Sequence, residues 1–339
     1  MKKWISLIAF CAVVLCTIPG VNEVLVEKGY NRYYMLEKEL QRRDETYDVQ
    51  IYGSCHAYTS YNPMYLIEDY GISAYNMSNP GEIIPSTYLR MKEQFEDYVP
   101  KVALVEIWGV NPYETYDSTE SILGEYFTCN IERLPLSKEK LEVIFDFNEL
   151  KIIEDNVAMV RYKNRLLSLD LTEADFDYSF EKADTIYNTT GEYNWLYHEM
   201  KVRFSYNGYL WLLSTGVASD YVQQQAYVDP SEKLAVEPII MKYVDKIIEL
   251  CDEYGVELIF YRAPYRSTEN ELRKVNYLKE YFAEKQVPFF DLEERIEYDH
   301  VNDFYDFEHL AEGGADKSTE FLNRYVLDAL GIEPLKEGE

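Results

Sequence analysis

The sequence is short of basic residues. Its 339 residues include 33 Lys and Arg against 61 Asp and Glu, which gives a formal net charge of −28 at pH 7. A nucleic-acid-binding protein needs a basic surface to neutralise phosphates, so this composition argues against that class of protein. Hydrophobic residues still make up 47% of the chain, which is enough to form a core and argues against a disordered chain.

Cysteine is scarce and is not arranged in metal-binding pairs. Of the five cysteines, Cys11 and Cys16 fall in an apolar N-terminal run, which leaves Cys55, Cys129 and Cys251 elsewhere. Three cysteines do not form a disulfide framework, and no Cys-x-x-Cys pair or Cys/His spacing indicates zinc. We therefore expect neither a metal nor a cofactor, and we expect Cys251 to be a core residue on the apolar face of a helix.

The amino terminus carries a long uncharged run. Lys2 and Lys3 precede the run from Trp4 to Asn22, whose 19 residues are close to the ~20 that span a bilayer as a helix. Residues 1–25 are therefore predicted to be a transmembrane signal anchor, with a cleaved signal peptide as the alternative. The positive-inside rule places the lysines in the cytoplasm. We expect a single-pass cell-membrane protein whose bulk is extracytoplasmic, or a secreted protein if the signal is cleaved.

Apolar segments alternate between strand-like and helix-like patterns. This alternation is typical of a parallel sheet covered by helices. We predict a three-layer α/β domain with a parallel five-stranded sheet, formed by residues 26–112 and 236–339. The predicted strands are 49–52, 72–75, 102–108, 257–261 and 287–290, and the predicted helices are about 86–98, 238–254, 268–284 and 321–330.

Residues 113–235 do not follow this rhythm. Because a structureless loop of this length is improbable in a compact domain, we predict a large insertion after the third strand, folded as an aromatic-rich subdomain. Its aromatic residues form either the subdomain's own core or a wall on which sugars stack. The main run of them comprises Tyr193, Trp195, Tyr197, Tyr206, Tyr209 and Trp211.

Polar motifs follow the strands at the edge where open α/β sheets place their sites. Each motif alone has an ordinary explanation as a turn or a helix start. Together they provide a nucleophile, an oxyanion donor and an Asp/His pair whose imidazole serves as a general base. The motifs are Gly-Ser-Cys-His-Ala at 53–57, Gly-Val-Asn-Pro at 109–112 and Asp-Phe-Glu-His-Leu at 306–310.

The chain has four histidines, and His309 is the candidate base among them. His56 is adjacent to the nucleophile in sequence, where its side chain would normally point away from it. His198 lies in the insertion, and His300 lacks the Asp-x-x-His spacing. A further alternative is a metal site built from His300, Asp303, Asp306 and His309.

These motifs resemble those of the SGNH, or GDSL, hydrolase superfamily, whose blocks include Gly-Asp-Ser, Gly-x-Asn-Asp and Asp-x-x-His. The resemblance covers residues 47–112 and 236–330 and implies a flavodoxin-like domain. With an N-terminal anchor, the chain resembles the extracytoplasmic proteins of bacterial envelopes that attach or remove acyl groups. These include proteins of teichoic-acid D-alanylation and of polysaccharide O-acetylation.

The resemblance assigns roles to particular residues. It implies a nucleophile at Cys55, an oxyanion donor at Asn111, and the orienting Asp and the basic His of the last block at Asp306 and His309. The second oxyanion donor falls on Gly81 within 76–81, a poor match that also permits Ser78.

Three positions depart from the superfamily pattern. Cys55 stands where Ser is usual, Ser54 where Asp is usual, and Pro112 where a second Asp is often found. A thiol beside an imidazole ionises more readily than a hydroxyl, so a Cys–His pair can still form an acyl-enzyme and can favour transfer over hydrolysis. The alternatives are that Ser54 is the nucleophile, or that the site is chemically idle.

The expected function is that of an extracytoplasmic esterase or O-acyltransferase acting on a cell-envelope polysaccharide or related polymer. Its expected partners are the glycan or acyl-ester substrate, the membrane through the N-terminal helix, and a membrane acyl-donor protein. The alternative is a catalytically inactive envelope protein that keeps the fold and binds or assembles glycan.

Overall fold

The computed structural model describes residues 46–111, 122–132, 134–146, 158–168, 206–214 and 226–335, with a few isolated residues before these. The chain forms two compact units, one of residues 1–42 with 131–197 and the other of residues 43–130 with 198–339. The second unit contains the sheet and all three polar motifs.

The second unit is built on a five-stranded sheet in which every neighbouring pair is parallel. Each strand overlaps its predicted segment, so the predicted α/β class with a parallel five-stranded sheet is confirmed. Strands β1 and β3 are buried along their whole length, which explains their nearly unbroken apolar sequences. In spatial order, the strands are β2 (Ala74–Asn76), β1 (Val49–Tyr52), β3 (Val102–Glu106), β4 (Glu257–Arg262) and β5 (Phe289–Asp291).

Helices cover both faces of this sheet. Ile259 and Tyr261 of β4 belong to a buried cluster with Leu322, which lies on α18 (Glu312–Ala329). The intervening Phe260 stacks on Phe282 of α16 (Glu269–Lys285) with ring centroids 4.5 Å apart. Since successive strand residues point to opposite faces, α18 and α16 lie on opposite sides of the sheet.

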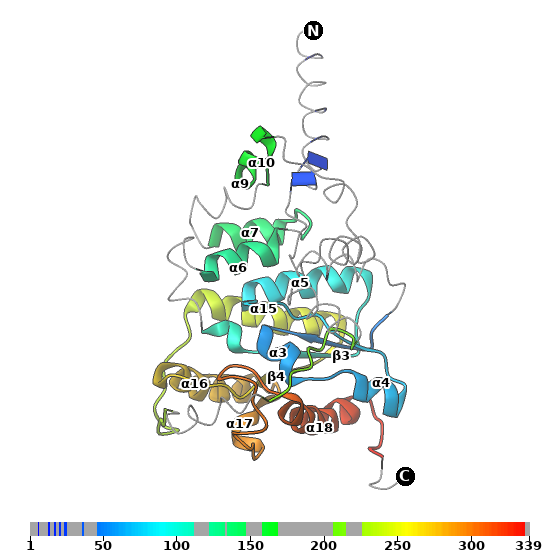
Figure 1. Cartoon of the computed structure of the whole chain (residues 1–339), viewed down its shortest axis with the longest axis vertical. Helices are drawn as coiled ribbons and strands as arrows, with labels where there is room; N and C mark the ends of the chain where they lie inside the picture. Colours follow the sequence, from blue (N-terminus) through cyan, green and yellow to red (C-terminus); the bar gives the residue numbers. More distant parts are fainter. Residues whose placement is uncertain are drawn as a thin grey trace. The chain divides into compact units, whose positions relative to one another are not determined.

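Two more helices complete the face that α16 covers. Tyr88 of α5 (Ile84–Asp97) contacts Tyr243 of α15 (Pro238–Tyr254) with ring centroids 5.8 Å apart. The hydroxyl of Tyr281 on α16 hydrogen-bonds to Asp245 of α15. Figure 1 shows α5 and α15 running side by side, with α18 on the other side of the strands.

The long helices begin and end where their sequences indicate. Pro238 occupies the first turn of α15, and Gly255 ends that helix with a left-handed φ of 69°. Helix α16 begins with a capping box between Thr268 and Glu271. Helix α18, by contrast, begins at Glu312 and not near residue 321. Its start is not visible in the sequence because a glycine is needed there, where the backbone of Asp303 comes close. A Cβ on Gly314 would lie 2.3 Å from the carbonyl oxygen of Asp303, so this turn requires glycine, which otherwise disfavours helix.

Three short helices escaped the sequence prediction. They are α3 (Cys55–Ser60), α4 (Met64–Tyr70) and α17 (Leu292–Arg295), each too short to show a helical hydrophobic period.

Most of α6 (Ile122–Ile131) and residues 206–214 belong to the unit that contains the sheet. The other described helices of residues 113–235 belong to the other unit and are α7 (Lys138–Asp146), α9 (Ala158–Arg161) and α10 (Lys163–Ser168). Near the end of α6, Asn130 donates a hydrogen bond to the carbonyl of Pro80 at 3.1 Å. Residues 206–214 lie along the sheet edge, where the amide of Asn76 donates to the carbonyl of Asn207 at 2.9 Å.

The aromatic run of this region is only partly described. Tyr209 is fully buried and Trp211 is 40% exposed, so these two residues do not share one environment. The other part of the run, Tyr193 to Tyr197, lies outside the described residues, and so does His198.

Within the described part of the chain, no helix is both long and apolar enough to cross a membrane. The predicted anchor at residues 1–25 lies largely outside that part.

Candidate active site

The first motif forms a tight turn between β1 and α3. Gly53 has a φ of 133°, and a Cβ at this position would lie 2.8 Å from the Cβ of Glu106. Only glycine fits both the backbone conformation and the close approach of β3. The turn leaves Cys55 partly exposed as the first residue of α3, while Ser54 and His56 are buried.

The last motif forms a short loop in which the carboxylate of Asp306 contacts the imidazole of His309. The Nδ1 atom of His309 lies 3.0 Å from each carboxylate oxygen of Asp306. Asp306 also accepts the backbone N–H groups of Glu308 and His309 at 2.8 Å. A backbone hydrogen bond from Tyr305 to the carbonyl of His309 closes the loop. The imidazole is 24% exposed and the carboxylate 36%, so the pair is open to a substrate.

Cys55 and His309 are far apart in sequence, but both contact His56: Cys55 Sγ lies 3.8 Å from its Nδ1 atom, and the His309 ring stacks on it with centroids 5.5 Å apart. Burial alone would raise the pKa of Cys55, but the neighbouring imidazoles, His309 first and His56 second, hold it well below its ordinary value. Burial would lower the pKa of His309, but Cys55 and Asp306 raise it well above its ordinary value. Both shifts favour a thiolate–imidazolium pair. Because Nδ1 is bound to Asp306, Nε2 is the nitrogen left for Cys55.

His56 does not point away from Cys55, and the sequence-based expectation was wrong on this point. Its Nδ1 atom lies 3.8 Å from Cys55 Sγ. Its ring stacks on those of Trp108 and His309, with centroids 5.2 and 5.5 Å away, and contacts Tyr265 at 4.8 Å. The Nδ1 atom also lies 3.0 Å from Ser54 Oγ, and this contact holds the ring beside the thiol.

Ser54 faces the interior and not the open site. Its hydroxyl lies 3.0 Å from Glu106 Oε2 and 3.0 Å from His56 Nδ1, and it accepts the backbone N–H of His56. Glu106 is itself fully buried, and its other oxygen accepts the backbone N–H of Trp108 at 2.8 Å. Burial raises the pKa of the Glu106 carboxyl. The hydroxyl proposed as an alternative nucleophile is thus already committed to other groups.

Asn111 lies at the same edge of the sheet, at the end of a short 3-10 helix (Trp108–Val110). Its Nδ2 donates to the hydroxyl of Tyr265 at 2.7 Å, and its buried Oδ1 has no partner in the described part of the chain. Exchanging the two amide atoms lets Tyr265 donate to Oδ1 and frees Nδ2 as a donor. The Asn111 amide can therefore supply one further hydrogen bond.

In the second block, residues 76–81, neither Gly81 nor Ser78 stands out as an oxyanion donor. Gly81 has a φ of 56°, and a Cβ there would lie 2.3 Å from the ring of Tyr126, so contact with α6 is enough to require glycine. Ser78 is fully buried and its hydroxyl hydrogen-bonds to Asn76. Asn79 donates its backbone N–H to the carbonyl of Gly53, beside the nucleophile turn, at 3.1 Å. Among the described residues, no group hydrogen-bonds to its buried side-chain amide.

The alternative metal site is not assembled. Asp303 pairs with Lys317 at 2.6 Å, while His300 stacks on Phe304 with centroids 5.8 Å apart. In the described ranges, no three His, Cys, Asp or Glu side chains are grouped closely enough to hold a metal ion.

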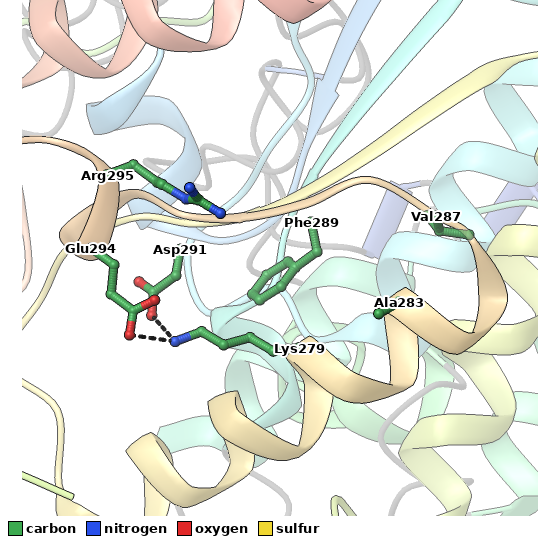
Figure 2. Close-up of a pocket in the computed structure, with 7 residues that line it drawn as sticks. All are labelled: Lys279, Ala283, Val287, Phe289, Asp291, Glu294 and Arg295. Carbon is green, nitrogen blue, oxygen red and sulfur yellow. Dashed lines mark ion pairs between the residues drawn. The ribbon is translucent and has the colours of Figure 1, made fainter. Parts of the chain in front are cut away.

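A cavity of about 260 Å³ lies at the β5 edge of the sheet. Figure 2 shows that Lys279 there pairs with Asp291 and Glu294, at 3.1 and 2.7 Å. These charged groups are already paired with one another, and the cavity contains none of the predicted site residues.

Sequence reasoning missed three residues of the site: Glu106, Trp108 and Tyr265. A signal for Glu106 was available, because a carboxylate at the buried end of the run Val-Ala-Leu-Val-Glu requires partners. Trp108 and Tyr265 follow β3 and β4 at the edge where the site lies. An aromatic residue in such a turn is too common to be distinguished by sequence alone.

No protein-family model matches the chain, and the search of curated proteins finds no significant similarity. The assignment of this site therefore depends on its geometry.

Proposed function

We propose that the protein is an SGNH-like esterase or O-acyltransferase with a Cys55–His309–Asp306 triad. The observation that carries the proposal is the grouping of a partly exposed thiol with two imidazoles, one of which, His309, is held by a carboxylate. This arrangement has the form of a nucleophile, a base and an orienting acid.

In the proposed first step, the Cys55 thiolate attacks the carbonyl carbon of an acyl ester. The ester C–O bond breaks, and the leaving oxygen takes the proton of His309 Nε2, so an alcohol departs and a thioester remains. Asp306 holds the imidazole in position throughout. The Asn111 amide and the backbone N–H of Cys55 are the proposed oxyanion donors, with Gly81 as the third candidate.

In the second step, water or an acceptor hydroxyl gives its proton to His309 and attacks the thioester carbonyl. The C–S bond breaks and the thiolate is regenerated. Hydrolysis results when the acceptor is water, and transfer results when it is a hydroxyl of another molecule.

The proposed setting is the cell envelope. The apolar run behind Lys2 and Lys3 supports a membrane anchor with the α/β unit outside the cytoplasm. The strand order β2-β1-β3-β4-β5 supports the flavodoxin-like arrangement that the superfamily resemblance implies. We infer an envelope polysaccharide or related polymer as acceptor or substrate, and a membrane protein as acyl donor.

The test is to trap the acyl-enzyme. The full-length protein is incubated with p-nitrophenyl acetate, quenched in acid and examined by peptide mass spectrometry for acetylation. We expect acetylation of Cys55 that is absent in Cys55→Ala and strongly reduced in His309→Ala. Acetylation of Ser54 in its place would assign the nucleophile there. A folded protein that acquires no acetyl group at either residue would support the idle, glycan-binding alternative.

A further inference from the structure

A second imidazole beside the nucleophile is not used by the proposed triad. The ring of His56 is 1% exposed and lies among the rings of Trp108, Tyr265 and His309. Its Nδ1 atom approaches both Ser54 Oγ and Cys55 Sγ, at 3.0 and 3.8 Å. Its Nε2 atom is buried without a hydrogen-bond partner in the described residues.

The hydrogen bonds around Ser54 determine which nitrogen of His56 carries the proton. With Glu106 ionised, both of its oxygens accept, one from the backbone of Trp108 and the other from the Ser54 hydroxyl. Ser54 has a single hydroxyl hydrogen, which this bond uses. Its oxygen must then accept from His56, through the backbone N–H and through Nδ1–H. His56 is therefore protonated at Nδ1.

We propose that His56 is a positioning residue whose single Nδ1–H, donated to Ser54 Oγ at 3.0 Å, is shared with Cys55 Sγ at 3.8 Å, in a tautomer fixed through Ser54 by Glu106. The inference depends on the proposed function, because it gives this donor a role only if Cys55 is the nucleophile. Ser54 then acts as a hydrogen-bond relay and not as a nucleophile. His56 lowers the pKa of Cys55, second to His309.

The second donor has a distinct use in the reaction. In the second step, His309 takes the proton of the acceptor, so its charge is shared with the tetrahedral intermediate that forms. The N–H of His56 is a second donor to the thiolate that must leave Cys55 in that step. The titratable groups that face His56 are Cys55 and His309 at the site and Glu106 and Tyr265 behind it.

Glu106→Gln is the decisive variant because it reverses the relay without changing its shape. The backbone N–H of Trp108 requires an oxygen at the Oε1 position, so the new amide NH₂ must face Ser54. The Ser54 oxygen then accepts from Gln, and its hydrogen turns to His56 Nδ1, which must be unprotonated. His56 becomes the Nε2–H tautomer and loses its donor to Cys55.

The tautomer is measured directly by ¹⁵N NMR of histidine side chains, with the His56 signals assigned from the His56→Asn variant. We expect Nδ1–H in the wild type and Nε2–H in Glu106→Gln. The rate of iodoacetamide alkylation of Cys55 is followed against pH in the same proteins. We expect the midpoint to rise by about one pH unit in Glu106→Gln, about tenfold in rate on the acid side.

Matched substitutions at position 56 separate the donor from packing. His56→Phe keeps the ring and removes the donor, so it should raise the alkylation midpoint at least as far as Glu106→Gln does, because Glu106→Gln also removes a buried negative charge that repels the thiolate. His56→Asn places an amide N–H near the Nδ1 position and should restore most of the shift.

The outcomes distinguish the two proposals. An Nε2–H tautomer in the wild type would overturn the inference, whatever the variants do. Unchanged alkylation in folded Glu106→Gln and His56→Phe, with a rapidly alkylated wild type, would also overturn it and leave the triad intact. If the wild-type Cys55 is not rapidly alkylated at all, the proposed function fails first.

Discussion

At the residue scale, the described cysteines differ in burial and in the side chains that surround them. Cys55 is partly exposed between two imidazoles, whereas Cys129 and Cys251 are buried. Burial raises the pKa of Cys251 to about 12. The Cys55 thiol is therefore poised to react, whereas the Cys251 thiol is protected.

The first prediction concerns alkylation. At pH 7, iodoacetamide should modify Cys55 at least tenfold faster than Cys129 or Cys251, because the reaction rate follows the thiolate fraction and exposure. Peptide mass spectrometry over a time course measures the three rates in one sample. His309→Asn is the control, and it should slow the modification of Cys55 alone. Equal rates at all three cysteines in the folded protein would rule out a poised thiol.

The second prediction concerns the base. His309→Ala should lower turnover of an ester substrate by at least ~10³-fold, and Asp306→Ala by a comparable or smaller factor. Removing the imidazole leaves neither a base for the thiol nor a proton for the leaving group. His300→Ala is the matched control, because His300 stacks on Phe304 and is not part of the triad. Activity that survived His309→Ala but not His300→Ala would reject the assignment.

At the scale of elements, the carboxyl end of β4 supports the site from behind. Arg262 is buried, pairs with Asp291 of β5 at 2.8 Å, and lies 4.9 Å from the ring of Tyr265. Tyr265 in turn contacts both Asn111 and His56. The ion pair thus fixes an aromatic residue on which two polar side chains of the site depend.

The third prediction concerns this ion pair and its dependence on pH. Arg262→Met should lower the free energy of unfolding by about 3 kcal/mol near pH 7, since it leaves Asp291 buried with Lys279 as its remaining partner. Urea unfolding measured from pH 7 to pH 3 tests this value. Asp291→Asn is the milder control, because Arg262 then keeps Glu293 at 2.8 Å.

The sign of the pH effect follows from the Asp291 carboxyl. Burial would raise its pKa, but Arg262 and Lys279 lower it below its ordinary value. A lowered pKa contributes stability that is present above the unfolded value, about 3.9, and is lost as the pH falls through the folded value. The difference between the wild type and Arg262→Met should therefore shrink towards pH 3. A difference that grew on acidification would contradict this account of the pair.

The helices that could be predicted from sequence are those with a clear hydrophobic period. The cores of α5, α15, α16 and α18 show such periods, and the five strands were predicted instead from short apolar runs. The start of α18 could not be predicted, because Gly313 and Gly314 disfavour helix, and Gly314 is required by the nearby backbone of Asp303. The orientation of His56 could not be predicted either, because it depends on a six-residue helix.

At the scale of the whole molecule, the residues of the proposed triad could be named from sequence because their motifs were expected at the edge of the sheet where the strands end. The supporting residues could not be named, because their roles depend on distances across the sheet. Glu106 acts through Ser54, and Tyr265 through Asn111. Neither contact leaves a pattern along the chain.

The fourth prediction concerns location and remains separate from the chemistry. The uncharged run from Trp4 to Asn22 should keep the full-length protein in the membrane fraction, with the α/β unit accessible to external protease in intact cells. A variant lacking residues 1–25 and its export signal should stay in the cytosol and serves as the control. Recovery of the full-length protein in the cytosol would end the envelope proposal.

The neighbouring strands β3 and β4 are separated by about 150 residues of chain, and this spacing has a consequence during synthesis. At ribosomal rates of about 5–20 residues per second, β4 is made roughly 10 to 30 s after β3. Until then, β3 has an open edge, and Cys55 exists without His309. During synthesis, the thiol of Cys55 can therefore react, and the open edge of β3 can aggregate, until the last hundred or so residues have been made. We expect a chaperone or the export machinery to hold the chain during that interval.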